Sequence, residues 1–406
     1  MNRWRYYWRV LSTQIWFRAG LYAGFGVAAA LTAALVAPLV PREVADRLGG
    51  ESVEAILTIL ASSLLAVATF SLGAWVSAYT AVSQAATPRV AVLITSDEST
   101  QKALATFVGA FLYAVVAVTA IHARFYGEEG RAVLYLTSLV VVCLVAFRLL
   151  AWMSRLSNLA RVGHMIELVE QRTAECLASQ PPTSIPTPVD GETFEAPATG
   201  YIQNIDFPHL QRLAEEGGGC IEILAPVGSF RRRGEPLGRI SFGKQDGKTT
   251  EALQAAFSIA RTRTFDQDPR FGLIVLGEIA ARALSPGIND PGTAAEVAGV
   301  AVRLLDNWAR RTEPEADANI QNDRVVRPRL DPDVLVQDVF GPIIRYGMAD
   351  PVVTIRVQKG LHALAACQSA ISDAARSLSL EAAERARESL HKADRARFDA
   401  QFANRD

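Results

Sequence analysis

The segment from Val53 to Gln84 constrains the fold of this chain more than any other. It has no ionised side chain after Glu54, over about 30 residues, whereas a helix needs only ~20 apolar residues to cross the hydrocarbon core of a bilayer. Within a bilayer the backbone must satisfy its own hydrogen bonds, and a helix does so within a single segment. The sequence therefore predicts a transmembrane helix here.

This helix is rich in small hydroxyl side chains, which allow two interpretations. Small residues let helix backbones approach closely, and hydroxyls can bond within the helix or to a neighbour, so the residues indicate helix packing. The same residues would form a polar surface if copies of the helix surrounded a pore. The candidates for a pore lining are Ser62, Ser63, Thr69, Ser77 and Thr80.

Four spans are predicted, at about 19–40, 53–84, 103–122 and 132–152, within a transmembrane domain of residues 1–160. The first apolar run lacks a convincing cleavage site and is expected to be an anchor. Its Gly20-x-x-x-Gly24 spacing suggests a packing face. Because lysine and arginine are more frequent before the first span, between the second and third, and after the fourth, we expect both termini in the cytoplasm and the spans in a bacterial inner membrane.

The distribution of charge excludes several classes of function. No Asp, Glu, Lys or Arg lies at the middle of a predicted span, which disfavours proton-coupled transport. The formal net charge is -1 and the basic residues are interspersed with acidic ones, so no nucleic acid partner is expected. The four cysteines are far apart, which argues against a disulfide framework and against a zinc site.

The second half of the chain changes character several times. We expect a helical stalk that continues the fourth span and a proline-rich linker at 161–193, a small β unit at 194–243 and a helical domain at 244–402. Within these, 249–263 has helical spacing, 313–333 is expected to be a loop, and 351–402 is expected to be one long helix. Three consecutive arginines, Arg231 to Arg233, lie at a predicted hairpin, where they form either a solvated turn or an anion-binding site.

Two predicted helices meet at a short corner between Leu284 and Pro291. Each helix follows an Asp-Pro pair, in which Asp caps the helix and Pro occupies its first position. The corner is either structural or a binding site, because amides at a helix start can receive an anion. The carboxylate of Asp290 argues against an anion, since it can occupy those amides itself. The residues of this candidate site are Ser285, Asn289, Asp290, Gly292 and Thr293.

Two strings carry a resemblance to a known family: Ala86-Thr87-Pro88-Arg89 after the second span, and ALSPGINDPGTA from Ala283 to Ala294. The chain resembles an uncharacterised bacterial family of predicted four-span integral membrane proteins. The resemblance implies a cytosolic C-terminal domain and no established activity. The PVGSFRRRGEPLG string also resembles the hairpin of barrel-sandwich, biotinyl-like domains, but 194–242 contains no lysine that could be modified, so a carrier role is not expected.

The sequence therefore predicts a mainly α membrane protein: four transmembrane helices, then a cytosolic α+β domain with a barrel-sandwich-like β unit and a helical hairpin. It contains no GxSxG, HExxH, P-loop or GxGxxG motif, so we expect no enzyme, no catalytic residue, no metal and no cofactor. The partners expected are membrane lipid and further copies of the chain. Two functions stay open: an oligomeric channel-like conduit lined by the second span, with a cytosolic regulatory domain, or a membrane-anchored scaffold or sensor that binds through its cytosolic domain.

Overall fold

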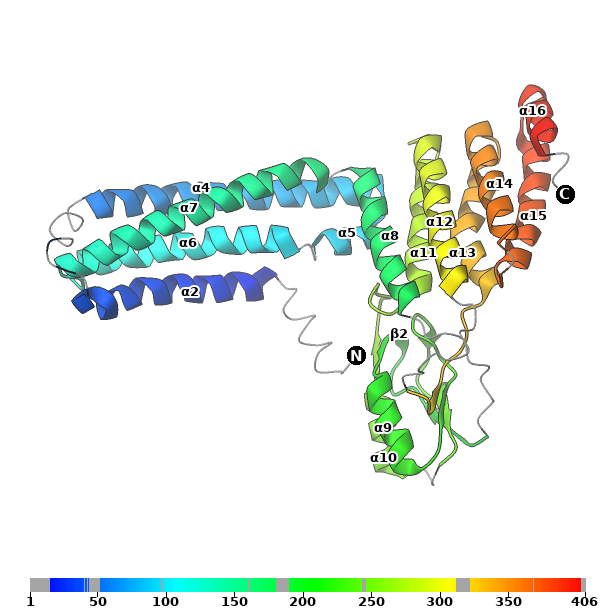
Figure 1. Cartoon of the computed structure of the whole chain (residues 1–406), viewed down its shortest axis with the longest axis horizontal. Coiled ribbons are helices and arrows are strands. Elements are labelled where there is room, and N and C mark those ends of the chain that lie inside the picture. Colours follow the sequence, from blue (N-terminus) through cyan, green and yellow to red (C-terminus); the bar gives the residue numbers. More distant parts are fainter. Residues whose placement is uncertain are drawn as a thin grey trace. The chain divides into compact units, whose positions relative to one another are not determined.

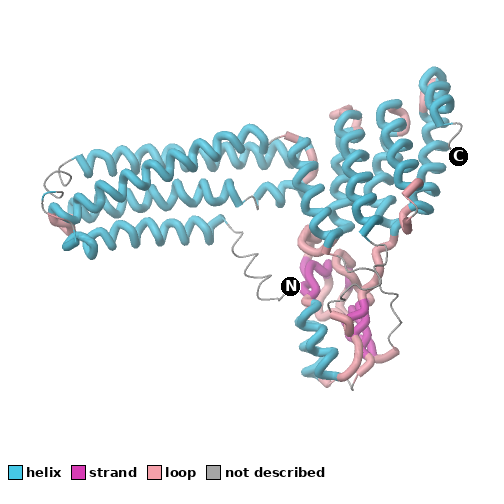
Figure 2. The backbone as a smooth tube through the Cα atoms, in the orientation of Figure 1, coloured by secondary structure: helices cyan, strands magenta, loops and turns pink. Residues whose placement is uncertain are grey.

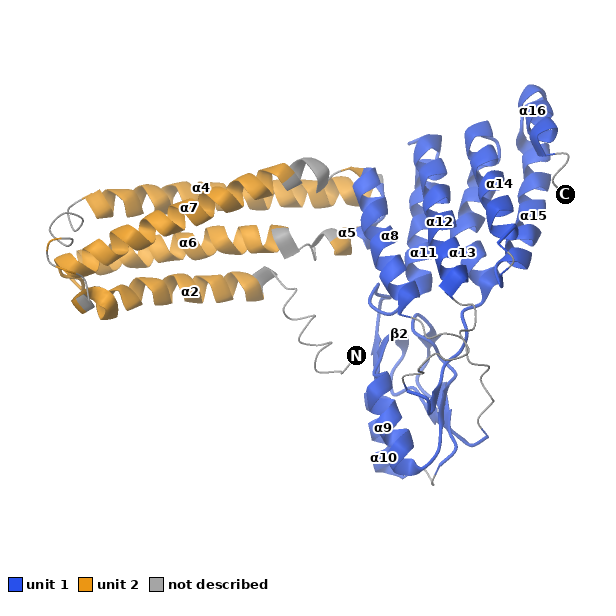
Figure 3. Ribbon diagram, viewed as in Figure 1, with its two compact units in different colours: residues 1–6, 85–90, 162–406 blue, residues 7–84, 91–161 orange. Residues whose placement is uncertain are grey.

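The structure of the protein is a computed structural model. It describes residues 15–39, 41, 43, 52–95, 98–159, 161–179, 190–242, 246–311, 322–367 and 369–402. The chain forms two compact units (Figure 3). One, here called the bundle unit, lies within residues 7–84 and 91–161, and the other, the C-terminal unit, comprises 85–90 and 162–406. Each unit is described by itself.

Four long helices form the bundle unit (Figure 1). They are α2 (Ile15–Val36), which is followed by the short 3-10 helix η1 (Ala37–Leu39), then α4 (Ser52–Ala85), α6 (Glu98–His122) and α7 (Glu128–Leu159). Each contains a stretch that is long and apolar enough to cross a membrane, at Phe17–Val36, Ser52–Gln84, Thr100–His122 and Glu128–Ser154. The four expected spans therefore correspond to these four helices.

Close approach of two glycines sets the packing of α2 against α6. A Cβ atom on Gly109 would lie 2.7 Å from the carbonyl oxygen of Tyr22, and a Cβ atom on Gly26 would collide with the carbonyl oxygen of Gly109. Gly20 and Gly24, by contrast, have no heavy atom within 4 Å of such a Cβ atom. The packing face expected at Gly20 and Gly24 is therefore wrong within the single chain, and Gly26 has that role.

Buried tyrosines add directional contacts to this apolar bundle. The hydroxyl of Tyr126 donates to the carbonyl oxygen of Ala30 at 2.6 Å, which ties the segment before α7 to α2. The Tyr113 hydroxyl on α6 lies 3.2 Å from the Ser138 hydroxyl on α7. Because a buried hydroxyl without a partner costs free energy, these contacts favour one arrangement of the helices.

A short helix, α5 (Pro88–Thr95), follows α4 and begins with the Thr87-Pro88-Arg89 string. The hydroxyl of Thr87 accepts a hydrogen bond from the Arg89 amide at 3.2 Å, which caps the helix. Residues 85–90 belong to the C-terminal unit, where Arg89 forms an ion pair with Glu278 of α11 (Pro269–Ala283). The two strings that carried the family resemblance therefore lie near one another, because α11 leads directly into the second.

The C-terminal unit contains all the described strands, gathered in one region (Figure 2). One sheet has the order β1-β5-β3-β7 and the other β4-β2-β6. All neighbours are antiparallel except β3 and β7. The strands are β1 (Glu192–Glu195), β2 (Gly200–Ile205), β3 (Ile221–Ile223), β4 (Phe230–Arg231), β5 (Pro236–Ile240), β6 (Phe257–Ala260) and β7 (Val325–Val326), with helices α9 (Phe207–Gly217) and α10 (Gly247–Ala255) between them.

The two sheets share one apolar core, as the barrel-sandwich expectation requires. Phe194 of β1 is buried and packs edge-on against Phe257 of β6, with ring centroids 5.7 Å apart.

Two segments of the β unit differ from the sequence-based expectation. The helix expected at 249–263 ends at Ala255, and Phe257–Ala260 pairs with β2 instead. The loop expected at 313–333 contains β7, which joins β3 from a hundred residues away.

The rest of the C-terminal unit is an array of helices in two rows (Figure 1). The helices α11, α13 (Pro332–Gly347) and α15 (Ser372–Ser389) form one row, and α12 (Pro291–Arg311), α14 (Pro351–Ala365) and α16 (Lys392–Phe402) form the other. A further helix, α8 (Val162–Ala178), packs against α11 and α12. Each helix contacts those next to it in its row, as in proteins built from stacked helical hairpins.

Asp-Pro pairs start four consecutive helices of the array: Asp268-Pro269, Asp290-Pro291, Asp331-Pro332 and Asp350-Pro351. Asp268 also forms a bidentate ion pair with Arg263, at 2.7 and 2.9 Å, and is almost completely buried. Burial raises the pKa of its carboxyl group above the ordinary value, despite the opposing effect of Arg263. The pair fixes the start of α11 beside the turn at Gly228 of the β unit.

Two further expectations are corrected by the array. The stalk that was expected to continue the fourth span is a separate helix, because α7 ends at Leu159 and α8 begins at Val162. The single helix expected at 351–402 is three helices, with breaks between Ala365 and Ser372 and between Ser389 and Lys392. The proline-rich linker falls on residues 180–189, which lie outside the described part of the chain.

Candidate functional site

The helix α4 has two faces of different composition. Its buried residues recur every three or four positions, which places them on one apolar face that packs into the bundle; they are Val53, Leu57, Leu60, Leu64, Ser71, Ala78 and Val82. At 3.6 residues per turn, Ser62, Thr69 and Thr80 lie on the opposite side of the helix, together with Thr58, Ala66 and Gly73. All six of these residues are exposed in the single chain. We call this line of six residues the outer stripe of α4; the apolar side chain of Val76 lies at the same angle as Thr58 and is 49% exposed.

The five pore-lining candidates are all exposed, but they do not all lie on the outer stripe. Ser62, Thr69 and Thr80 belong to it, whereas Ser77 and Ser63 are rotated from it by roughly 60° and 100° about the helix axis. The hydroxyl of Ser62 donates to the carbonyl oxygen of Thr58 at 3.0 Å, that of Thr69 to Leu65 at 2.8 Å, and that of Thr80 to Val76 at 2.9 Å. Each such hydroxyl oxygen can still accept a hydrogen bond from outside.

The interior of the bundle is apolar rather than channel-like. The core of the unit consists of alanine, valine, leucine and aromatic side chains from α2, α4, α6 and α7, among them Leu64, Phe107 and Trp152. The single chain therefore places none of the five candidates in an internal cavity. A polar path along α4 requires further copies of the chain.

The corner between α11 and α12 holds the second candidate set in direct contact. The Asp290 carboxylate accepts from the Thr293 amide at 3.1 Å and from the Thr293 hydroxyl at 2.6 Å, which lowers the pKa of the Asp290 carboxyl group. Asn289 has a left-handed backbone, with φ of 51°, and its amide donates to the carbonyl oxygen of Ser285 at 2.8 Å. Asp290 thus occupies the start of α12, where an anion would otherwise bind.

The other members of this set support the turn. The Ser285 hydroxyl donates to the carbonyl oxygen of Arg282 at 2.6 Å. A Cβ atom on Gly292 would lie 3.2 Å from a carboxylate oxygen of Asp290, so glycine leaves room for the capping side chain. Asp350 caps α14 in the same way at the next corner, where its carboxylate accepts from the amides of Val352 and Val353. The shared arrangement indicates a structural role for the SPGINDP string.

The three arginines of the β4–β5 hairpin are mostly engaged with the protein itself. Arg231 donates to the carbonyl oxygens of Phe230, Pro236 and Leu224, at 3.2 to 3.4 Å. Arg232 pairs with Glu235 at 2.7 Å. This arrangement favours the solvated turn over an anion-binding site.

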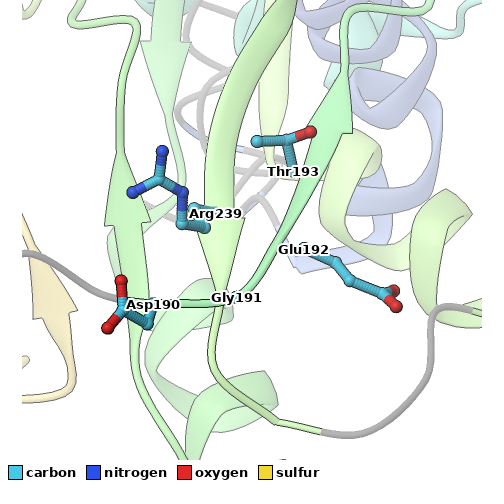
Figure 4. A pocket seen from close by; sticks show the side chains of 5 residues that line it. All are labelled: Asp190, Gly191, Glu192, Thr193 and Arg239. Carbon is cyan, nitrogen blue, oxygen red and sulfur yellow. The ribbon is translucent and has the colours of Figure 1, made fainter.

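Two hollows lie on the surface of the C-terminal unit. The larger, of about 590 Å³, is lined by Asp190, Gly191, Glu192, Thr193 and Arg239, and Figure 4 shows Glu192 directed away from Arg239. It is open, and no apolar side chain lines it, whereas small-molecule sites are mostly apolar with a few polar groups. The smaller, of about 320 Å³, lies between α13 and α15, where Asp338 at its edge already pairs with Arg270 at 2.8 Å.

The described residues contain no group of three or more His, Cys, Asp or Glu side chains placed to hold a metal ion. Cys176 is buried and its thiol donates to the carbonyl oxygen of Phe265 at 2.9 Å. Burial raises the pKa of this thiol to about 12, so it is protonated and unreactive at neutral pH. The candidate features that are left are the outer stripe of α4 and the helical array.

Comparison with known proteins places this architecture in a family. Residues 12–363 match the family described as predicted membrane protein (DUF2254). The chain belongs to this family. The match includes all four candidate spans and continues to α14, which confirms the resemblance noted from the sequence at the level of the family.

The chain is similar to curated proteins over part of its length. Uncharacterized proteins from Mycobacterium bovis and from two strains of Mycobacterium tuberculosis are each 28% identical to it over 206 residues. The matched region covers 48% of this chain and 38% of each relative, so the chain spans well under half the length of the relatives that it matches. No solved structure matches the chain.

Proposed function

We propose that this DUF2254 protein is a subunit of an oligomeric, channel-like conduit in the bacterial inner membrane, in which copies meet along the outer stripe of α4. The observation that carries the proposal is the composition of that stripe: small and hydroxyl residues on the side of α4 opposite its packed apolar face. Both termini lie in the cytoplasm in this proposal, in accordance with the positive-inside rule.

The stripe differs from the surfaces that α7 and α2 expose. Exposed side chains on those helices are large and apolar, for example Phe147 at 67% exposed, Leu150 at 68% and Leu35 at 78%. Such side chains suit contact with lipid chains. The outer stripe instead has Ala66 and Gly73 between its hydroxyl residues, and a Cβ atom on Gly73 would meet nothing within 4 Å. Small residues of this kind permit another helix to approach closely.

The hydroxyl geometry suits either a neighbouring helix or water. Because Ser62, Thr69 and Thr80 donate to their own helix, these three hydroxyl donors are satisfied in the bilayer. Their oxygens remain acceptors toward the axis of an assembly. Uncharged hydroxyls and apolar constrictions are among the features that determine permeation through a pore.

Cysteine cross-linking in membranes tests the assembly. We expect Thr69→Cys to form disulfide-linked dimers, since one thiol per subunit can join two neighbouring copies, and Phe147→Cys, on the exposed side of α7, to serve as the control that stays monomeric. The four native cysteines are replaced by alanine in both variants. Current through planar bilayers that contain the purified wild-type protein then tests the conduit. A monomeric Thr69→Cys protein, or oligomers that carry no current, would contradict the conduit.

A second candidate is a membrane-anchored scaffold, favoured by the corners of the helical array. A Cβ atom on Gly347 would lie 3.0 Å from the Leu284 side chain, so the α11–α12 and α13–α14 corners are adjacent. These corners expose the large apolar side chains of Ile288, Tyr346 and Val352, at 44% to 57%. Oligomers without current would support this function, in which the array binds a protein partner.

A further inference from the structure

Two hydrogen-bond donors without partners lie one helical turn apart near the end of α7. The Nε atom of Arg148 and the Nε1 atom of Trp152 are both buried, and neither has a hydrogen-bond partner. Residues four apart lie on the same face of a helix, with Cβ atoms roughly 5–6 Å apart. Buried donors in native proteins are nearly always hydrogen-bonded. This pair therefore lacks the acceptor that such donors require.

Arg148 also lies at a depth where a charge needs a partner. Among the described residues, no carboxylate forms an ion pair with its guanidinium group. Arg148 lies in the candidate span Glu128–Ser154, roughly 9 Å along the helix axis from its end. This span has 27 residues, whereas ~20 suffice to cross the hydrocarbon core, so Arg148 lies near the boundary between acyl chains and headgroups. A charge there is stabilised by a polar or anionic group that reaches it.

The helix α6 places a basic side chain at the same level as Arg148. The helices α6 and α7 are antiparallel, and the hydroxyls of Tyr113 and Ser138 lie 3.2 Å apart, which sets their register. Counting the same number of residues back from Tyr113 and forward from Ser138 brings Ala103 level with Arg148. Next to Ala103 is Lys102, which lies about three full turns from Tyr113 and thus on the face of α6 that meets α7.

The helix α2 adds a third basic side chain to this end of the bundle. The start of α2 lies at the same end as the start of α6 and the end of α7 (Figure 1). A Cβ atom on Gly109 would lie 2.7 Å from the Tyr22 carbonyl oxygen, so these two residues are level. Arg18 lies one turn before Tyr22, and α2 and α6 run in the same direction, which places Arg18 within about one turn of Lys102. Positive charge from three helices is thus gathered near Arg148.

We propose that this end of the bundle binds the phosphate group of an anionic phospholipid, with the Arg148 guanidinium and the Trp152 indole N–H as donors. The planar fork of a guanidinium matches the oxygens of a phosphate group. Three basic side chains at one level favour a lipid with net negative charge. Arg148 is partly exposed, so a headgroup can reach its terminal nitrogens, whereas Trp152 is 2% exposed and supplies the inner donor.

The surface beside Arg148 suits the acyl chains of the same lipid. Leu144, one turn from Arg148 toward the middle of the span, is 45% exposed, and Phe147 is 67% exposed. In the orientation proposed above, the headgroup belongs to the inner leaflet. The inference goes beyond the conduit, because the site lies within one subunit and requires no second copy of the chain.

Binding of radiolabelled lipid to the immobilised, detergent-purified protein tests the site in a scintillation proximity assay. The probes are dioleoylphosphatidylglycerol, which is anionic, and dioleoylphosphatidylcholine, which has the same acyl chains and no net charge. We expect wild-type protein to bind the anionic lipid more tightly. Arg148→Gln should weaken this binding roughly 5-fold or more, the effect of removing one basic residue near an anionic lipid surface, and should leave binding of the neutral lipid almost unchanged.

Two further variants separate the donors from a general effect of charge. Trp152→Phe removes the indole N–H but keeps an aromatic ring, and should weaken binding of the anionic lipid roughly 2- to 10-fold. Arg131→Gln makes the same change of charge at the opposite end of α7 and should bind this lipid as wild type does. Circular dichroism and the thermal unfolding temperature verify that each variant is folded.

An excess of inorganic phosphate distinguishes a lipid from a free anion. We expect the anionic lipid to stay bound, because its acyl chains add to its affinity. Displacement of the lipid by phosphate would overturn the assignment to a lipid. Equal binding of the two lipids by wild type, or equal losses in Arg148→Gln and Arg131→Gln, would also overturn the proposal. None of these measurements requires oligomers or current, so their outcome is independent of the conduit.

Discussion

At the scale of single residues, the contact between α2 and α6 depends on the absence of two side chains. Gly109→Leu introduces a side chain where even a Cβ atom would lie 2.7 Å from the Tyr22 carbonyl oxygen. The helices must then separate, and we expect a loss of roughly 1–3 kcal/mol of stability, the usual cost of overpacking a well-packed core. The thermal unfolding temperature of the purified protein in detergent measures the loss.

Gly24→Ala is the control, because α2, the partner helix of α6, offers a glycine with open space around it. No heavy atom lies within 4 Å of a Cβ atom on Gly24, and alanine favours helix over glycine by up to about 1 kcal/mol. The variant should unfold at the wild-type temperature or slightly above it. A Gly109→Leu protein as stable as Gly24→Ala would show that α2 and α6 do not approach closely at these residues.

At the scale of elements, the α11–α12 corner depends on the cap that Asp290 provides. Asp290→Ala removes the acceptor for the Thr293 amide and hydroxyl, and loss of such a cap costs about 1 kcal/mol. The pKa of Asp290 is lowered in the folded protein, chiefly by the Thr293 hydroxyl. Its contribution is therefore fully present above the unfolded pKa of about 3.9, and is lost as the pH falls through the lower folded value.

Hydrogen exchange of the first turn of α12 measures this effect at neutral pH and near pH 3. We expect faster exchange in Asp290→Ala at neutral pH, and a smaller difference from wild type at the acidic pH. Asp373→Ala is the control: Asp373 lies in the first turn of α15, its side chain is 95% exposed, and α15 has no side-chain cap. Equal exchange in wild type and Asp290→Ala at neutral pH would refute the capping role.

At the scale of the whole molecule, the orientation of the four spans sets which loops face the outside. The segment after α6 should be outside and the α11–α12 corner inside, because lysine and arginine are in excess on the other side of the spans. In a cysteine-free background, Phe125→Cys should react with a membrane-impermeant maleimide in intact spheroplasts, whereas Gly287→Cys should react only after lysis. Both positions are exposed. Labelling of Gly287→Cys in intact spheroplasts would place the C-terminal unit outside.

The spans and the helix starts of the array are properties that the sequence determined by itself. A helix in lipid is specified by a local quantity, a long run without charge, so Val53–Gln84 identified α4 without reference to any other segment. An Asp-Pro pair likewise acts on its own next turn, through a capping carboxylate and a fixed φ, and it marked the starts of α11 and α12. The capping role of Asp290 at the α11–α12 corner followed from the same local chemistry.

Only the tertiary structure decided the elements whose state depends on distant partners. Phe257–Ala260 has helical spacing but becomes a strand. Its backbone pairs with β2, and the Phe257 side chain packs against Phe194 in the core of the β unit. Val325–Val326 is a strand because its backbone pairs with β3. Gly26, rather than Gly20 or Gly24, contacts α6, because the neighbouring helices set the rotation of α2 about its axis. Short segments gain too little free energy from local preference to fix their conformation, so burial against partners far along the chain determines it.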